Sequence, residues 1–465
     1  MRSLIYYAGF YGGAAAFLRL IGFLIFMWLG KSLSVSDFGN FGLLYAFQQA
    51  LATFTLAGIV EAFSGMLGEK RCYERHQQLL AAATIAFFLM ATAGALFGFI
   101  WILCFKSLDI SLLTYVSVIG GGILLALSSF QAQLVRFEEK HSWSLLFSFC
   151  PPLGGIIGGA AAFFVGKTLS AFFMGSLLGE VIPLFIFWMN RIGFWYKNAS
   201  LREVFHILSK AAPFMVIAFL GWLSGYGNNY VIKFFFQSIE VAKFTFALSL
   251  CSVMLLVAGA LNQVWCPRFY RIIHQLPFQQ VEDKNKSFYK ILSVLLGLLG
   301  GAVIIAFPSV IKFFGGNLLL YQSLNIGLSF LFSGYIFLTP WWHCQNFFLA
   351  NGMGQNLLKI TLLTSFIGVA FLLGFMKFFG PIGIYLGFLF QMILRALGIV
   401  FVARQNWAIN ISWQGVIIGI GMVFSGLLIS YFSTSVIISL VCYSISMVIL
   451  AGIFLFNEFI LLYKK

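Results

Sequence analysis

The chain has 465 residues, of which 61% are hydrophobic and only 9% are charged, and its mean hydropathy is +0.98. No soluble domain buries that much apolar surface, so the composition excludes a soluble enzyme or binding module and indicates a multi-pass membrane protein. The net charge of +15 does not indicate nucleic-acid binding, because no basic run alternates with an aromatic recognition motif.

Fourteen apolar segments are long enough to cross roughly 30 Å of hydrocarbon, which takes about 20 helical residues. In chain order the predicted spans are 5–30, 38–66, 79–105, 110–135, 144–165, 169–190, 211–233, 241–265, 288–314, 324–350, 358–379, 382–403, 413–431 and 434–457. The last two are separate because residues 413–457 carry no charge and as one helix would run about 68 Å. The pattern predicts an all-α polytopic protein whose first span is a retained helix and not a removed signal.

The Lys and Arg residues divide unequally between the predicted connections. Nineteen lie on the same side as the N-terminus and seven on the opposite side, and Arg19 and Arg395, which lie within spans, complete the 28. Because cytoplasmic connections carry the excess of positive charge, both ends are predicted to lie on the cytoplasmic side. The largest connections, 191–210 and 266–287, are then cytoplasmic.

Short outer connections leave no room for a catalytic domain, which disfavours a membrane glycosyltransferase or glycan polymerase. The chain lacks a nucleotide-binding Gly-Lys-Ser/Thr loop, an HExxH metal motif and a Gly-x-Ser-x-Gly elbow. We therefore expect no catalytic residue, no metal site and no enzyme activity. Transport without ATP remains, driven by a gradient or running downhill. Gly154-Gly155 and Gly158-Gly159 are predicted to be sites of close helix packing.

A short repeat suggests two lobes. Asp37 and Glu240 precede spans two and eight at an offset of 203 residues, and Phe41 and Phe244 repeat that offset. An acidic residue suits the N-terminus of the following helix because of the helix dipole. Six spans separate the copies, so both run the same way through the bilayer, as in parallel repeats. The predicted parts are an N-lobe at 1–200, a C-lobe at 201–410 and two additional helices at 411–465.

The turn Leu33-Ser34-Val35-Ser36-Asp37-Phe38-Gly39-Asn40-Phe41, followed by Leu56-Ala57-Gly58-Ile59-Val60-Glu61-Ala62, resembles the Wzx-type polysaccharide transporters that flip lipid-linked O-antigen units. These belong to the multidrug/oligosaccharidyl-lipid/polysaccharide (MOP) exporter superfamily. The resemblance implies two MATE-like six-helix lobes, a lipid-linked oligosaccharide substrate and polysaccharide polymerase machinery as a partner. The chain departs from the family at Gly227-Asn228-Asn229-Tyr230, where an acidic and a basic residue often occur.

Arg19 lies near the midpoint of the first span, on a stripe of small residues at three- and four-residue steps. A charge at this depth costs about 2.5–3.5 kcal/mol on insertion scales, so it must face a wet cavity or a partner. A guanidinium binds phosphate oxygens bidentately, which makes Arg19 a candidate ligand for a diphosphate headgroup. The structural alternative is an ion pair with Glu61 or Glu180.

Arg395 shares a face of span twelve with Gln391, and both are candidate substrate ligands. The alternative for Arg395 is snorkelling to the inner headgroups. Gln48 lies on a polar stripe of span two that also carries Tyr45 and is a further candidate. These three residues extend the predicted substrate site beyond Arg19.

Glu180 lies at the middle of span six, three residues before Pro183, whose missing amide leaves a carbonyl free. Such a carboxyl is a candidate site for a coupling proton or sodium ion. The alternative is a packing carboxyl. Glu61 is the second ion-coupling candidate, although it does not share the face of Gln48. No other cofactor is expected.

Span ten contains Pro340, which is predicted to kink it, followed by Trp341 and His343. His343 is a candidate sugar ligand, and the alternative is a satisfied core histidine. Asn228 and Asn229 in span seven are also candidate sugar ligands, with interhelical hydrogen bonding as the alternative.

The function that these observations favour is a flippase for a polyprenyl-diphosphate-linked oligosaccharide, working by alternating access between lobes. Its partners are the substrate and the membrane lipids. A cation-coupled drug extruder is one alternative, but its cleft should hold more acidic residues than Arg. A peptidoglycan-precursor flippase is the other, with more Arg expected in its cavity than the two found here.

Overall fold

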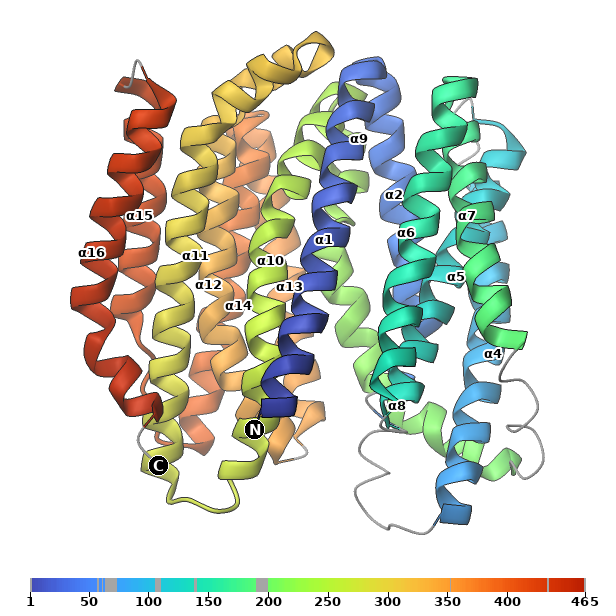
Figure 1. Cartoon of the computed structure of the whole chain (residues 1–465), viewed down its shortest axis with the longest axis horizontal. Helices are drawn as coiled ribbons and strands as arrows, with labels where there is room; N and C mark the ends of the chain where they lie inside the picture. The colour runs from blue at the N-terminus through green and yellow to red at the C-terminus, as the bar shows by residue number, and fades with distance from the viewer. Residues whose placement is uncertain are drawn as a thin grey trace. The chain divides into compact units, whose positions relative to one another are not determined.

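The computed structural model describes residues 2–56, 58–60, 62, 73–104, 110–137, 140–189, 200–351, 353–432 and 435–463. All regular structure in these residues is helical. The elements are α1 (Arg2–Ser32), α2 (Val35–Leu56), α4 (Tyr73–Cys104), α5 (Leu112–Phe137), α6 (His141–Gly166), α7 (Leu169–Met189), α8 (Leu201–Leu223), α9 (Asn228–Phe235), α10 (Ser238–Ile272), α11 (Phe278–Phe314), η2 (Gly316–Leu324), α12 (Asn325–Ala350), α13 (Gly354–Phe379), α14 (Ile382–Asn406), α15 (Trp413–Phe432) and α16 (Val436–Tyr463). Figure 1 labels these helices and colours them in chain order.

In the described part of the chain, 12 helices are long and apolar enough to cross a membrane by length and composition. The helices α1 and α2 are long but are not among them. Polar side chains such as Gln48 and Gln49 lower the apolar character of α2. The predicted all-helical membrane fold is confirmed, while the number fourteen and the inward orientation of both ends stay predictions.

Two boundaries differ from the prediction. The predicted span 211–233 is broken, because α8 ends at Leu223 and α9 begins at Asn228. The predicted connection 266–287 is wrong in its extent, since α10 continues to Ile272 and α11 already begins at Phe278. Polar residues at helical spacing, Glu282, Asn285 and Tyr289, are buried in this early part of α11 and therefore extend the helix beyond its apolar segment.

The starts of α2 and α10 have the predicted acidic residues in their first turns, Asp37 and Glu240. The Asp37 amide donates a hydrogen bond to Ser34 Oγ over 3.1 Å, and the Ser34 hydroxyl donates to Asp37 Oδ2 over 2.6 Å. This reciprocal pair satisfies free groups at the helix start, as a capping box does. Glu240 instead accepts a hydrogen bond from Lys243 over 2.8 Å.

The chain divides into two compact units. Unit 1 contains Met1–Ile25 and Asn40–Asn228, and unit 2 contains Phe26–Gly39 and Asn229–Lys465. The predicted boundaries at residues 200 and 410 stay predictions.

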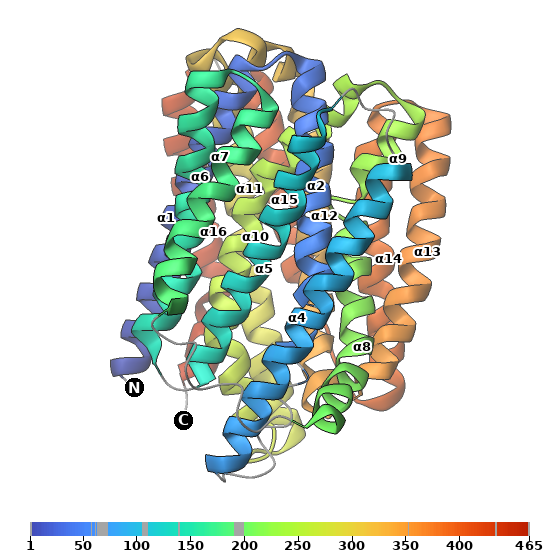
Figure 2. The same cartoon turned by 90° about the vertical axis from the view of Figure 1, so that its right-hand side faces the viewer.

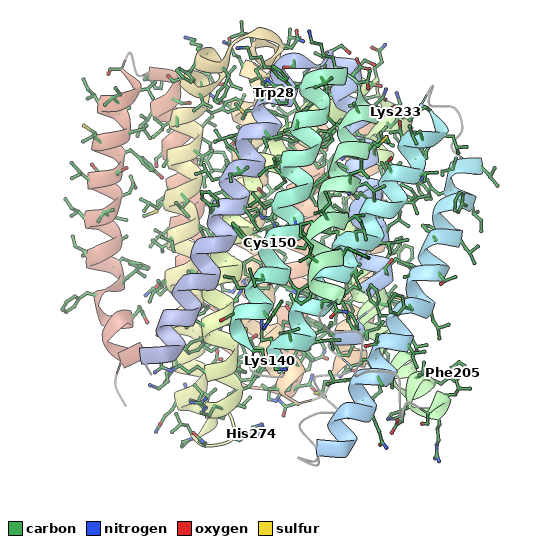
Figure 3. The ribbon with its side chains drawn as sticks, turned by 45° about the vertical axis from the view of Figure 1, so that its right-hand side comes forward. Trp28, Lys140, Cys150, Phe205, Lys233 and His274 are labelled. Carbon is green, nitrogen blue, oxygen red and sulfur yellow. The ribbon has the colours of Figure 1, made fainter. Side chains whose placement is uncertain are left out.

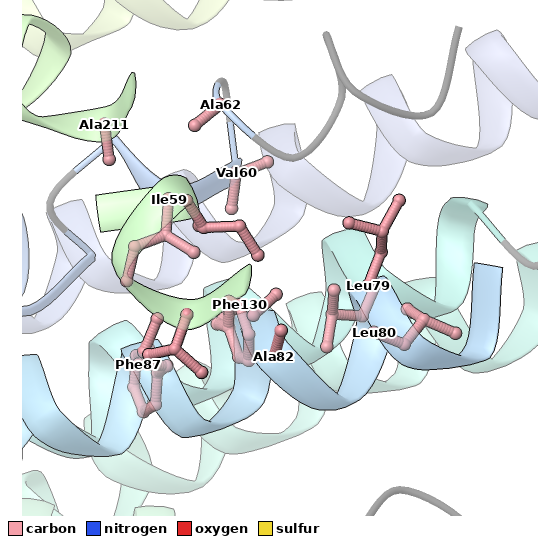
Figure 4. Packing of buried hydrophobic residues seen from close by; sticks show 14 of the residues in the cluster. Ile59, Val60, Ala62, Leu79, Leu80, Ala82, Phe87, Phe130 and Ala211 are labelled. Atoms are coloured by element: carbon pink, nitrogen blue, oxygen red, sulfur yellow. The ribbon is translucent and has the colours of Figure 1, made fainter. Parts of the chain in front are cut away.

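Unit 1 has an apolar core in which α4, α5 and α8 meet. Phe87 of α4 stacks on Phe130 of α5 with ring centroids 4.6 Å apart, and Ala211 of α8 belongs to the same cluster (Figure 4). In the same unit, α6 and α7 pack at backbone distance. A methyl group at Gly154 would collide with the Gly179 carbonyl, so the predicted close packing at these glycines is confirmed.

Unit 2 places α12 against α11, α14 and α15, and α13 against α14. Figures 1 and 2 show α15 beside α11 and α13 beside α14. Glycines again permit close approach, because a methyl at Gly297 of α11 would collide with Gly419 of α15. Helices that gain no hydrophobic drive in lipid rely on such contacts to associate.

The last helix, α16, packs on α11 through both apolar and polar groups. Leu455 of α16 clusters with Val294 of α11 and Met422 of α15. The Tyr443 hydroxyl donates to the Met422 carbonyl over 3.1 Å, and Glu458 pairs with Lys290 of α11 over 2.6 Å. Only 6% of the apolar stretch of α16 is buried, so most of its side chains face outward.

Charged and polar residues gather at the helix ends of unit 2. Figure 3 shows Lys233 near one end of this unit and His274 at the opposite end. The stretch between them is covered by apolar side chains, as a bilayer requires.

Candidate functional site

The predicted site residues fall in both units. Unit 1 contains Arg19, Gln48, Glu180 and Asn228, and unit 2 contains Asn229, His343, Gln391 and Arg395. Glu61 lies outside the described residues.

In unit 1, Glu180 of α7 is buried at the contact with α6. Its side chain is 6% exposed, and its Oε2 has no hydrogen-bond partner among the described residues. Gly155 of α6 leaves the room for this carboxyl, because a methyl there would lie 2.6 Å from both Glu180 Cγ and Oε1. A buried carboxylate oxygen without a partner is costly, so Glu180 stays a candidate ion-coupling residue.

Tyr45 of α2 connects the charged groups of unit 1. Its hydroxyl lies within electrostatic range of the Arg19 guanidinium and the Glu180 carboxyl, and its ring contacts Tyr226. The two tyrosine rings meet edge to face with centroids 5.6 Å apart. Arg19 itself is exposed, so its guanidinium is open to a ligand. The structure thus brings Arg19, Glu180 and two phenols into one neighbourhood.

The break between α8 and α9 positions Tyr226. It is anchored by Trp222, whose indole N–H donates to the Ala46 carbonyl over 2.8 Å. Asn228 then donates to the Ser224 carbonyl over 3.2 Å, while its Oδ1 has no partner in the described part of the chain. Interrupted helices with free polar groups are typical of transporter binding sites.

Sequence reasoning missed Tyr45 and Tyr226 as members of this group. The available signal was the pair Gly225 and Gly227, which interrupts an apolar segment next to two asparagines. Gln48, one turn from Tyr45 on α2, is buried against α5, where Gly121 and Gly122 leave room for it. Gln48 therefore lies within the helix packing of unit 1.

In unit 2, Arg395 and Gln391 lie one turn apart on α14, as predicted. Arg395 is 8% exposed, and its guanidinium carbon lies 5.0 Å from the centre of the Trp341 ring, a cation–π contact. Its Nε has no hydrogen-bond partner, and neither do the two amide atoms of Gln391, among the described residues. Gln391 lies against Gly368 of α13.

Another buried hydroxyl lies nearby on α13. Ser365, one turn from Gly368, has an Oγ without a partner in the described residues. An uncompensated guanidinium and an uncompensated amide in one unit are costly. The arrangement is suited to receiving an anionic, hydrogen-bonding ligand or ordered water.

His343 has a different environment. Its Nε2 lies 3.0 Å and 3.2 Å from the two carboxylate oxygens of Glu282, and both side chains are 1% exposed. The backbone N–H of Asn410 donates to Glu282 Oε1 over 2.8 Å. Glu282 thereby joins α11, α12 and the connection that precedes α15.

A hydrogen-bond network extends from this pair. Asn285 donates to the His343 carbonyl over 3.2 Å and accepts the Trp265 indole N–H over 2.9 Å. Asn346 donates to the Tyr289 hydroxyl over 2.9 Å. Sequence reasoning missed this network because Glu282 fell in a predicted connection. The helical spacing of Glu282, Asn285 and Tyr289 was the signal that would have found it.

The described residues contain no group of three or more His, Cys, Asp or Glu side chains that could hold a metal ion. Unit 1 presents an open guanidinium near a buried unpaired carboxyl. Unit 2 presents a buried unpaired guanidinium with an unpaired amide.

Comparisons with known proteins agree with this architecture. A family model described as polysaccharide biosynthesis protein matches residues 8–273. A search of curated protein sequences finds no significant match.

Among solved structures, the lipid II flippase MurJ in its inward closed conformation is similar, with a TM-score of 0.72 and 15% identity over 96% of this chain and 99% of that one. An inward-facing multidrug resistance MATE transporter of the MOP superfamily has a TM-score of 0.63 and 15% sequence identity, over 84% of this chain and 94% of that one. The eukaryotic MATE transporter AtDTX14 has a TM-score of 0.61 and 11% sequence identity, over 91% of this chain and 99% of that one. At these identities the likeness shows the fold, and that fold is shared by transporters and flippases.

Proposed function

Since the chain belongs to the polysaccharide biosynthesis protein family, we propose that it is a flippase for a polyprenyl-diphosphate-linked oligosaccharide, such as an O-antigen repeat unit. The substrate moves from the cytoplasmic to the outer leaflet of a bacterial inner membrane by alternating access. The glycan is then available to polysaccharide polymerase machinery on the outer side.

The observation that carries this proposal is the environment of Arg395. This guanidinium is buried and makes no ion pair or hydrogen bond with the described residues. A transporter of cationic drugs gains nothing from an uncompensated positive charge, whereas a diphosphate supplies the missing partner. The unpaired amide of Gln391 on the same face offers hydrogen bonds to the same headgroup or its first sugar.

Arg19 is the phosphate ligand that we propose for unit 1. It is exposed and lies near Tyr45 and Tyr226, whose hydroxyls are hydrogen-bond donors for phosphate or sugar oxygens. Asn228 and Asn229 at the helix break supply amides for the glycan. His343 is not part of this proposal, since its imidazole is buried and Nε2 faces Glu282.

Glu180 is the site that we assign to a coupling ion, either a proton or sodium. It is buried with an unpaired Oε2, and it lies within electrostatic range of the same Tyr45 that Arg19 affects. Uptake of a cation there neutralises the carboxyl and changes the charge balance around Arg19.

The experiment is complementation of a strain that lacks the gene. Loss of the protein should accumulate lipid-linked repeat units on the cytoplasmic side. Arg395→Ala should restore neither export nor surface glycan. Arg395→Lys should restore part of both, because it keeps the positive charge but loses the bidentate guanidinium. Arg271→Ala, at an exposed arginine, is the matched control. Each variant is compared at equal membrane abundance.

A normal lipid-linked pool in the deletion strain would overturn the flippase. Accumulation of the peptidoglycan precursor instead of repeat units would assign the protein to cell-wall synthesis. Normal transport per molecule in Arg395→Ala would remove the phosphate role from this residue.

A further inference from the structure

A groove opens on the surface of unit 2 where α14 ends and α15 begins. Both helices pack against α12, and the groove between them has a volume of about 630 Å³. It is lined by Leu397, Val400, Phe401, Arg404, Gln405 and Trp413. Its size falls within the range of small-molecule sites, roughly 300–1,000 Å³.

One wall of the groove is a continuous apolar stripe of α14. Leu397, Phe401 and Arg404 recur at three- and four-residue steps and therefore share one face of the helix. Leu397 is 49% exposed and Phe401 is 68% exposed, so the stripe is not covered by the described part of the protein. Such a stripe accommodates an acyl chain that runs along the helix.

Arg404 lies at the end of this stripe, in the last turn of α14. It is exposed and forms no ion pair or hydrogen bond with any residue that the structure describes. The lining contains no acidic residue. A free guanidinium above an apolar wall is therefore available to an anion.

Trp413, the first residue of α15, lines the side of the groove opposite α14. Tryptophan and arginine are the residues that proteins place at the level of lipid headgroups. The excess of positive charge predicts this end of unit 2 to be cytoplasmic, where anionic lipids attract basic pockets between helices.

We propose that this groove is a binding site for one anionic glycerophospholipid, with its phosphate at Arg404 and an acyl chain along Leu397 and Phe401. Charge complementarity selects this occupant. The lining supplies a single positive charge, which matches the single phosphate charge of phosphatidylglycerol. A polyprenyl diphosphate carries more negative charge than one guanidinium compensates.

The test measures lipid retention by the full-length purified protein. After delipidation, the protein is incubated with phosphatidylglycerol or phosphatidylcholine that have identical acyl chains, and bound lipid is counted by native mass spectrometry. The wild type should prefer phosphatidylglycerol by about fivefold, because one Arg near the headgroups contributes on the order of 1 kcal/mol. Arg404→Gln should abolish this preference, and Arg404→Lys should keep most of it.

Arg271→Gln is the matched control, since Arg271 is an exposed cation in the last turn of α10 outside the groove. It should retain the preference. Phe401→Ala should lower the retention of both lipids equally, because it shortens the apolar wall. Thermal unfolding in the same detergent verifies that each variant is folded.

Three outcomes would overturn the site. An unchanged preference in Arg404→Gln would show that this guanidinium binds no phosphate. If Arg271→Gln lost the preference for phosphatidylglycerol to the same extent as Arg404→Gln, the lipid would be attracted by the whole basic surface and not by this groove. Displacement of phosphatidylglycerol by polyprenyl phosphate at lower concentration than by added phosphatidylglycerol would assign the groove to the isoprenoid carrier.

Discussion

The two units contain two buried carboxylates with opposite environments. Glu180 in unit 1 is 6% exposed and has an unpartnered Oε2 among the described residues. Glu282 in unit 2 is 1% exposed, yet both of its oxygens are engaged by His343, and one also accepts the Asn410 N–H. Because a buried charge is costly unless it is paired, the difference separates a carboxylate that the fold satisfies from the one that we propose for ion coupling.

The largest expected effect comes from removing the paired carboxylate. Glu282→Ala should lower the free energy of unfolding by about 3–5 kcal/mol, because breaking a buried pair leaves His343 and the Asn410 amide unsatisfied. Unfolding of the purified protein in detergent measures this loss.

The neighbouring Asp283 provides the control. It is exposed, so Asp283→Ala should change the unfolding free energy by no more than about 0.5 kcal/mol. Equal effects of the two substitutions would show that burial and pairing do not distinguish Glu282 from its neighbour.

Helix packing in unit 2 provides a smaller effect. Gly419→Ala should destabilise by about 1–3 kcal/mol, because the methyl would lie 2.5 Å from the Ser293 carbonyl oxygen of α11. Gly421→Ala, two residues along α15, should be neutral or stabilising, since a methyl there meets no described atom within 4 Å. The comparison uses unfolding in one detergent, and a larger loss at Gly421 would contradict the α11–α15 contact.

Removal of the unpaired carboxylate of Glu180 should affect transport and leave the stability of the fold nearly unchanged. Glu180→Gln should change the unfolding free energy by less than about 1 kcal/mol, since no partner is lost, but should remove the dependence of transport on a proton or sodium gradient. Proteoliposomes with imposed gradients measure the coupling. Retained gradient dependence, or a stability loss as large as that of Glu282→Ala, would place Glu180 among the structural groups.

The smallest effect is a pH dependence at the end of α16. Burial raises the pKa of Glu458, but the hydrogen bonds from Lys290 and Ser287 and the nearby Lys charges outweigh it, so the pKa lies below its ordinary value of 4.5. A carboxyl with a lowered folded-state pKa stabilises the fold above its unfolded-state pKa and loses that contribution as the pH falls through the folded-state value.

Thermal unfolding between about pH 6 and pH 3 checks this sign. Glu458→Gln should lower the melting temperature at pH 6, and the difference in melting temperature between the variant and the wild type should become smaller toward pH 3. A difference that grows on acidification would contradict the ion pair with Lys290.

The membrane class, the helices and the resemblance to polysaccharide transporters were predictable because lipid imposes long apolar segments and because the Asp37 turn is local in sequence. Arg395 and Gln391 were predictable as neighbours from helical spacing alone. The break at residues 224–227 was missed because the apolar average of that segment conceals its local signal, Gly225 and Gly227. The helical spacing of Glu282 and Asn285 was also a local signal, but the pairing of Glu282 with His343, 61 residues away, is set by the tertiary fold.

The polar attachment of α16 has a consequence for chain synthesis. The contacts from Glu458 to Ser287 and Lys290 span 171 and 168 residues, and a growing chain emerges with its N-terminal part first. Lys290 is therefore synthesised long before its carboxylate partner. A chain that stops before residue 458 leaves that ammonium without the ion pair that holds the end of α16 against α11.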